Sequence, residues 1–156
     1  MNGEARLSRA ILWGGLIAGT LDLTAACITT ILRGRTPVGV LHFIASGLLG
    51  DKGLEGGASM AALGVLLHYV IAYGATTVYA LASRKLGVMV REPVVSGLLY
   101  GSLVYLFMNC IVLPLSALPV KPNYTSTSIA IGQLIIMVCI GLPIALIVRR
   151  YSQRSE

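Results

Sequence analysis

The sequence predicts an all-α integral membrane protein, a four-helix bundle with a short amphipathic or re-entrant helix between the first and second spans. Four apolar stretches each reach or exceed the ~20 residues that a membrane-spanning helix needs. Of the 156 residues, 56% are hydrophobic and 12% are charged, which leaves too few polar side chains to cover a water-soluble fold. The length suits a single transmembrane domain over residues 1–156, without a second, water-soluble domain.

The four predicted spans are joined by short connections. They cover residues 10–32, 58–82, 93–116 and 127–148. The first span follows Arg6 and Arg9, and the third begins at Pro93. In the fourth, we expect Pro143 to kink the last turns, because proline lacks the N–H that an interior helix position donates.

A short helix is predicted over residues 37–50. Its apolar side is formed by Val38, Leu41, His42, Ala45, Leu48 and Leu49. Its fourteen residues would make a helix of ~21 Å, shorter than the ~30 Å hydrocarbon core, so we do not expect a fifth crossing. The segment either rests on the membrane surface or is re-entrant and forms a lid over a cavity. In the second case His42 is a possible lid residue, and the glycines between Gly47 and Gly57 loosen the chain as a hinge.

The basic residues divide unequally between the two sides of the membrane. Eight are predicted on one side, namely Arg6, Arg9, Arg84, Lys85, Arg91, Arg149, Arg150 and Arg154. Four are predicted on the other, namely Arg33, Arg35, Lys52 and Lys121. The positive-inside rule therefore places both termini in the cytoplasm. Since membrane topology explains the net charge of +6, the expected partner is the lipid bilayer and not nucleic acid.

Small residues recur at three- and four-residue spacing along each span, where they let helix backbones approach one another. These predicted inward faces contain Gly15, Gly19, Asp22, Ala26 and Thr29 in the first span, Ala61, Gly64, His68, Ala72, Ala75 and Tyr79 in the second, Gly97, Gly101, Tyr105 and Asn109 in the third, and Gly132 and Gly141 in the fourth. Polar side chains share these faces, so we expect them to point into the bundle.

Four of the polar side chains are predicted at similar depth. At 1.5 Å per residue, Asp22, His68, Gln133 and Asn109 lie ~18 to ~24 Å from the cytoplasmic helix ends. An ionisable group at such a depth costs about 2.5 to 3.5 kcal/mol and normally faces protein or a water-filled cavity. We therefore expect Asp22 and His68 to pair, directly or through water, in a hydrophilic cavity that opens outward. Asn109, Gln133 and Tyr79 are the other candidate binding residues of this polar cluster.

Each candidate has a structural alternative. Asp22 is either a proton-linked carboxylate or cation site, or a hydrogen-bonded strut between the first two spans. A neutral His68 is satisfied by one hydrogen bond. Asn109 and Gln133 are residue types that commonly join helices, and an interfacial histidine such as His42 is usually solvated.

The sequence predicts no metal site, no cofactor and no catalytic activity. Two histidines and three scattered cysteines provide only an irregular set of zinc ligands. A bis-histidine haem would require His42 and His68 to face each other. Ser102 lies at a different depth from His68, and there is no Gly-x-Ser-x-Gly elbow, which argues against an intramembrane enzyme.

The third span contains the run Gly97-Leu98-Leu99-Tyr100-Gly101, followed by Leu106-Phe107, Pro114-Leu115 and Leu118. Together with Gly15-Leu16-Ile17-Ala18-Gly19, and with Tyr79 eleven residues after His68, this pattern resembles the YagU-like inner-membrane proteins, a functionally uncharacterised bacterial family. Asp22 and Asn109 depart from the family pattern. The resemblance implies a location in the bacterial inner membrane and does not imply a mechanism.

These features favour a small carrier or channel in which Asp22 and His68 bind a cation or a proton. Because four short helices enclose little volume, such a protein would work as a homo-oligomer. The alternative is a structural or accessory subunit of a larger membrane complex, in which the buried polar groups set only the register of the helices. A polar cluster serves equally well in either role, so the sequence leaves both functions open.

Overall fold

The structure, a computed structural model, describes residues 3–119 and 125–152. These residues form helices and connecting turns, with no strand among them. Four helical segments are long and apolar enough to cross a membrane, namely Gly3–Leu32, Ala58–Lys85, Pro93–Leu115 and Ser126–Ser152. The predicted all-α fold with four membrane-spanning helices is therefore confirmed. Lys121 and Arg154, which count in the charge distribution, lie outside the described residues.

Two spans are continuous α-helices, α1 (Gly3–Leu32) and α4 (Ala58–Lys85). The other two each contain one π-helical turn. The third span consists of α6 (Pro93–Phe107), η1 (Met108–Val112) and α7 (Leu113–Leu115), and the fourth of α8 (Ser126–Ile136), η2 (Met137–Gly141) and α9 (Leu142–Ser152). Each π turn ends two residues before a proline, whose ring would clash with the carbonyl group four residues earlier in a regular α-helix. The chain thus accommodates Pro143 with a wider turn.

Three shorter helices lie in the described connections between the spans: α2 (Val38–Leu49), α3 (Asp51–Glu55) and α5 (Val88–Arg91). The sequence predicts α2 but not α3, because the glycines between Gly47 and Gly57 indicate a loose segment. Instead, Gly53 lies within α3, buried against the backbone of Ser46 in α2. Gly50, whose φ of 61° favours glycine, makes the turn between the two helices. The glycines here allow close packing as well as a tight turn.

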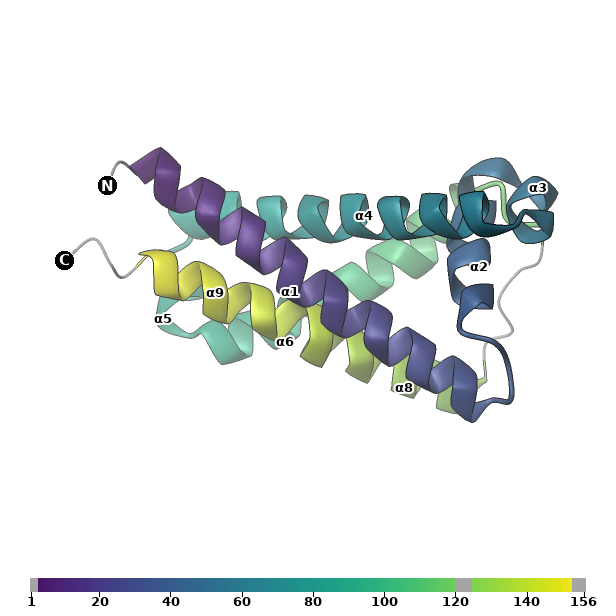
Figure 1. Cartoon of the computed structure of the whole chain (residues 1–156). Coiled ribbons are helices and arrows are strands. Elements are labelled where there is room, and N and C mark those ends of the chain that lie inside the picture. The colour runs from purple at the N-terminus through teal and green to yellow at the C-terminus, as the bar shows by residue number, and fades with distance from the viewer. Residues whose placement is uncertain (1–2, 120–124, 153–156) are drawn as a thin grey trace.

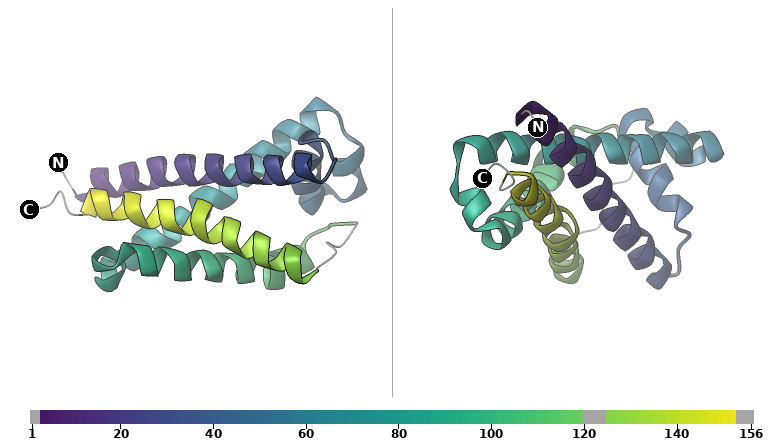
Figure 2. Two further views of the ribbon diagram at one scale, coloured as in Figure 1. Left: turned by 90° about the horizontal axis from the view of Figure 1, so that it is seen from below. Right: turned by 60° about the vertical axis from the view of Figure 1, so that its left-hand side comes forward.

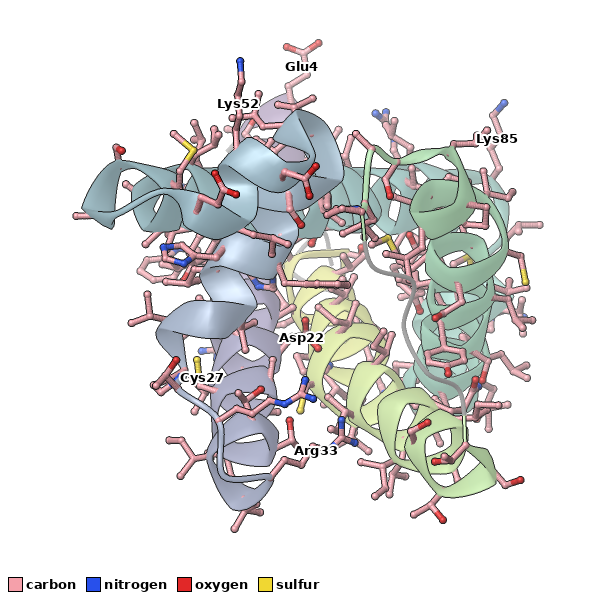
Figure 3. All side chains as sticks on the ribbon, turned by 90° about the vertical axis from the view of Figure 1, so that its right-hand side faces the viewer. Glu4, Asp22, Cys27, Arg33, Lys52 and Lys85 are labelled. Carbon is pink, nitrogen blue, oxygen red and sulfur yellow. The ribbon has the colours of Figure 1, made fainter. Side chains whose placement is uncertain are left out.

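The bundle is closed at one end and splayed at the other. The closed end is where α1 begins and α9 ends, and we call it the terminal end (Figure 1). The splayed end carries α2 and α3, and we call it the α2 end (Figure 1). α1 and α4 diverge toward the α2 end, where α2 lies across the space between them (Figures 1 and 3). Figure 2 shows α1 beside α9 near the terminal end, whereas α1 and α8 separate toward the α2 end.

α1 and α4 pack closely through two glycines of α1. A Cβ atom on Gly14 would lie 2.7 Å from Cγ2 of Thr76, and one on Gly19 would lie 3.0 Å from the ring of Tyr69. Both distances are shorter than ordinary van der Waals contact, so a larger residue would push the helices apart. Inside lipid, where apolar side chains gain little by leaving the tails, such close approach is a main source of helix association.

The third and fourth spans pack in the same way. A Cβ atom on Gly101 would lie 2.6 Å from Cα of Met137, and one on Gly141 would overlap the carbonyl oxygen of Gly97. These contacts confirm that Gly97, Gly101 and Gly141 lie on inward faces, as their spacing predicts. The backbones of α6 and η2 therefore touch without intervening side chains.

A compact core fills the bundle toward the terminal end. Its most buried members include Tyr79, Ala80, Ile144, Ala145 and Val148. The hydroxyl of Tyr100 donates a hydrogen bond to the carbonyl oxygen of Ala75, at 2.6 Å, and so joins α6 to α4. Outside this core, large aliphatic side chains face away from the protein, and Leu99 is 63% exposed. This distribution is expected for a surface that contacts lipid.

Three spans extend beyond their predicted limits. α1 begins at Gly3 and not at residue 10, α4 continues to Lys85, and α9 continues to Ser152. The extra turns carry charged residues such as Arg6, Arg84 and Arg149. Apolar runs mark only the part of a helix that hydrocarbon covers, and arginine and lysine have the helix propensity to continue it into the interface.

Gly141→Ala is expected to destabilise the bundle by about 1–3 kcal/mol, because the new Cβ atom would collide with the backbone of α6. Gly74→Ala is the matched control, since a Cβ atom there meets no atom within 4 Å and alanine favours the helix. Circular dichroism during unfolding in mixed detergent micelles measures the two stabilities. Equal stabilities would contradict packing through glycine.

Candidate functional site

A cavity of about 410 Å³ lies at the α2 end of the bundle. Its lining includes Asp22 and Ala26 of α1, His68 and Ala72 of α4, Met108 of η1, Ile140 of η2, and Phe43, Ile44 and Leu48 of α2. All four spans and α2 therefore contribute to one space. The cavity lies where the spans diverge, so it is a consequence of the splayed packing.

Asp22 and His68 line this cavity from neighbouring helices. Nε2 of His68 lies 2.8 Å from the carbonyl oxygen of Gly19. Because a carbonyl oxygen only accepts hydrogen bonds, Nε2 is the donor, and Nδ1 of the neutral ring is an acceptor. Asp22 and His68 form no direct hydrogen bond with each other, although they lie close enough to interact electrostatically. Figure 3, seen from the α2 end, shows Asp22 between α1 and the α8–α9 helix.

Asn109 and Gln133 do not line the cavity. Nδ2 of Asn109 donates to the carbonyl oxygen of Tyr105 on the same helix, at 2.8 Å. Nε2 of Gln133 lies 3.6 Å from Sδ of Met137, also on its own helix. Gly101 and Tyr105, which share the predicted face of Asn109, pack against the fourth span and do not line the cavity. The third span lines the cavity through a neighbouring face, which carries Val104, Met108 and Val112.

Tyr79 also lies outside the cavity lining. Its side chain is fully buried in the core toward the terminal end, and its hydroxyl donates to the carbonyl oxygen of Met89 at 3.1 Å. Of the predicted binding residues, the structure thus brings Asp22 and His68 together at one cavity. Tyr79 instead ties the end of α4 to the short helix α5.

The cavity is not the hydrophilic space that its two ionisable residues suggest. Apart from Asp22, His68, Ser116 and Gly47, every lining residue in the described part of the chain is apolar. The reason is that neighbouring turns of each helix present leucine, isoleucine, valine or methionine beside the polar groups. A ligand here would meet one carboxylate and one imidazole on an otherwise apolar wall.

α2 forms one wall of the cavity and is attached to α4. The carbonyl group of Leu41 packs directly against Gly64, where any side chain would collide with it. Nε2 of His42 lies 3.2 Å from the carbonyl oxygen of Gly57, just before α4 begins. His42 itself does not line the cavity, so it holds α2 in place and does not face a ligand.

The sequence also contains a repeated heptapeptide, which hydropathy and small-residue patterns do not reveal. Residues 108–114 read Met-Asn-Cys-Ile-Val-Leu-Pro and residues 137–143 read Met-Val-Cys-Ile-Gly-Leu-Pro, with five of seven positions identical. Each copy forms a π turn, and Met108, Val112 and Ile140 from the two turns line the cavity. Since π turns occur frequently at functional sites, the repeat supports a functional role for this space. Alignment of the third span on the fourth would have found it.

The lining suits a particular class of ligand. With Asp22 ionised, its carboxylate attracts a cation into the cavity. Its apolar walls favour a cation with hydrocarbon substituents over a hydrated inorganic ion. Within the described part of the chain, no group of three or more histidine, cysteine, aspartate or glutamate side chains gathers to hold a metal ion.

No protein-family model matches the chain, and neither a curated protein nor a solved structure matches it. The resemblance to the YagU-like proteins therefore stays a prediction from the sequence.

Leu67→Trp is expected to weaken the binding of an apolar cation by about tenfold, because the larger side chain would occupy part of the cavity that Leu67 lines. Leu66→Trp makes the same replacement one residue earlier, on a side chain that is 60% exposed and faces away from the bundle. Equilibrium dialysis with radiolabelled tetraphenylphosphonium measures both affinities. Equal weakening by the two variants would contradict binding in this cavity.

Proposed function

We propose that the protein is a small membrane carrier that binds an apolar organic cation in the cavity around Asp22 and His68. The observation that carries this proposal is the convergence of one carboxylate and one imidazole, from two helices, on an otherwise apolar cavity. The carboxylate attracts the charge of the cation, and the apolar walls bury its substituents. Nδ1 of His68 accepts a hydrogen bond from a ligand that carries an N–H group.

The contacts of Asp22 favour binding over a purely structural role. A strut would need a hydrogen-bonding partner on another helix, yet the Asp22 carboxylate forms no hydrogen bond with any described residue. An ionisable group within a membrane span costs about 2.5 to 3.5 kcal/mol when it is placed in lipid. A bound cation offsets this cost through its attraction to the carboxylate, which accounts for an aspartate at this position.

The packing favours a carrier over a channel. The cavity lies at the α2 end, whereas glycine contacts close the spans on one another toward the terminal end. A channel requires a continuous path, while a carrier exposes its site to one side at a time. The π turns in the third and fourth spans are natural places for these helices to bend during such a change.

Asp22→Asn is expected to lower tetraphenylphosphonium uptake into proteoliposomes by at least about tenfold, because the amide keeps the shape of the side chain and removes its charge. In the unaltered protein, uptake should weaken as the pH falls, because protonation removes the charge of the Asp22 carboxylate. The variant should lose the part of the pH dependence that comes from Asp22.

Asp51→Asn is the matched control for this experiment. Asp51 is an exposed carboxylate in α3 and does not line the cavity. Its replacement removes the same charge, so uptake and its pH dependence should be unchanged. If the two variants behaved alike, the effect would belong to overall charge, and a site at Asp22 would be ruled out.

We also propose that α2 acts as a lid over the cavity. The amide of Ala117 donates to the carbonyl oxygen of Gly47 at 2.9 Å, and a Cβ atom on Gly47 would lie 3.9 Å from Cβ of Ser116. This separation is within the usual Cβ–Cβ range of a disulfide.

A Gly47→Cys, Ser116→Cys double variant, made after the three native cysteines are replaced by serine, should therefore cross-link on oxidation. Uptake should fall to background and return when dithiothreitol is added. The two single-cysteine variants control for the substitutions themselves. Full uptake by the oxidised, cross-linked protein would exclude a moving lid.

We further propose a homo-oligomer in the bacterial inner membrane with both termini in the cytoplasm, in line with the charge distribution and the family resemblance. Native mass spectrometry of the protein released in mild detergent tests this assembly. Copies of this chain that retain a small cation would support the carrier. Fixed stoichiometry with other proteins and no retained ligand would favour the accessory subunit.

A further inference from the structure

A second cavity, of about 370 Å³, lies at the terminal end of the bundle. It is enclosed by the start of α1, the end of α4, the helix α5 and the end of α9. None of its lining residues also lines the cavity around Asp22. The two spaces therefore belong to opposite ends of the protein, and the proposed cation site does not account for the second one.

The charge of this second cavity is positive. Arg6 of α1 and Arg84 of α4 line it, and among residues 3–119 and 125–152 no acidic residue does. Nε of Arg6 is buried and has no hydrogen-bond partner, which is costly for a charged donor. Glu4, the described acidic residue closest to Arg6 in sequence, is exposed and projects away from the bundle (Figure 3). The guanidinium groups are thus available to an anion.

The lining changes from polar to apolar along all three long helices. The polar members Arg6, Arg84 and Tyr151 lie toward the helix ends, together with Ser83 and Ser152. The apolar members Ala10, Ala80 and Val148 lie deeper along the same helices, in the buried core. A ligand that fits this cavity has an anionic head and a less polar part beneath it.

We propose that this cavity binds the phosphate group of an anionic ligand through Arg6 and Arg84. Guanidinium groups present paired N–H donors that match phosphate oxygens, and the hydroxyl group of Tyr151 is a further donor in the lining. Basic pockets between membrane helices bind phospholipid head groups in this way. A phosphodiester of an anionic phospholipid and free phosphate are two sources of the same chemistry.

The test compares lipid binding by variants of the full-length protein with native mass spectrometry. Phosphatidylglycerol and phosphatidylcholine are titrated separately into the detergent-solubilised protein. The unaltered protein should retain phosphatidylglycerol about tenfold more tightly than phosphatidylcholine, and the Arg6→Gln, Arg84→Gln double variant should lose this preference. Arg150→Gln is the matched control, because Arg150 is exposed at the same end but does not line the cavity.

Two further measurements separate the possible outcomes. Inorganic phosphate at millimolar concentration displaces phosphatidylglycerol if the natural source is soluble, and does not if it is the lipid. Arg6→Lys, Arg84→Lys keeps the charge and should weaken binding less than the glutamine variant, which separates loss of the site from loss of the fold. Equal loss of preference in Arg150→Gln, or none in the double glutamine variant, would overturn the proposal. Because tetraphenylphosphonium binding should be unchanged in every arginine variant, this test is independent of the carrier proposal.

Discussion

The structure depends on the close approach of helix backbones through glycine. Inside lipid, apolar side chains gain little by turning inward, so helices associate where small residues let them touch. α1 and α4 meet in this way at Gly14 and Gly19, and α6 meets η2 through Gly101 and Gly141. These contacts lie in the middle of the bundle and toward the terminal end. Closer to the α2 end, larger side chains separate the helices, which diverge, and α2 covers the space between them (Figure 1).

The candidate site begins where this close packing stops. Gly19 is the last of the α1 glycines that press against α4, and its carbonyl oxygen accepts the hydrogen bond from Nε2 of His68. Asp22 follows one turn later on α1, at the wall of the cavity. The same contact that joins the two helices therefore fixes the imidazole beside the carboxylate. Packing and candidate chemistry share one residue, and the hydrogen bond to Gly19 satisfies one ring nitrogen of His68 in an apolar environment.

Much of this arrangement is accessible from the sequence, because lipid imposes simple rules on length and composition. The apolar runs predict the four spans, the length of residues 37–50 predicts the short helix α2, and spacing predicts the inward glycines. Depth along a helix also selects Asp22 and His68 as partners of one cavity. Depth does not select Asn109 correctly, because the face of the third span that carries Tyr105 and Asn109 is not the face that lines the cavity. Nor does the presence of two ionisable groups reveal that their neighbours are apolar, since that depends on how far the helices diverge.

The most direct test of the central claim, that an apolar cation binds beside Asp22, is solid-state NMR of the protein in lipid bilayers with ¹³C-labelled aspartate. The two aspartates, Asp22 and Asp51, give two side-chain carboxyl signals. Addition of tetraphenylphosphonium should shift the signal of Asp22, identified by its loss in Asp22→Asn, and leave that of Asp51 unchanged. An unchanged Asp22 signal at saturating cation would contradict the account and favour a structural role for the cavity.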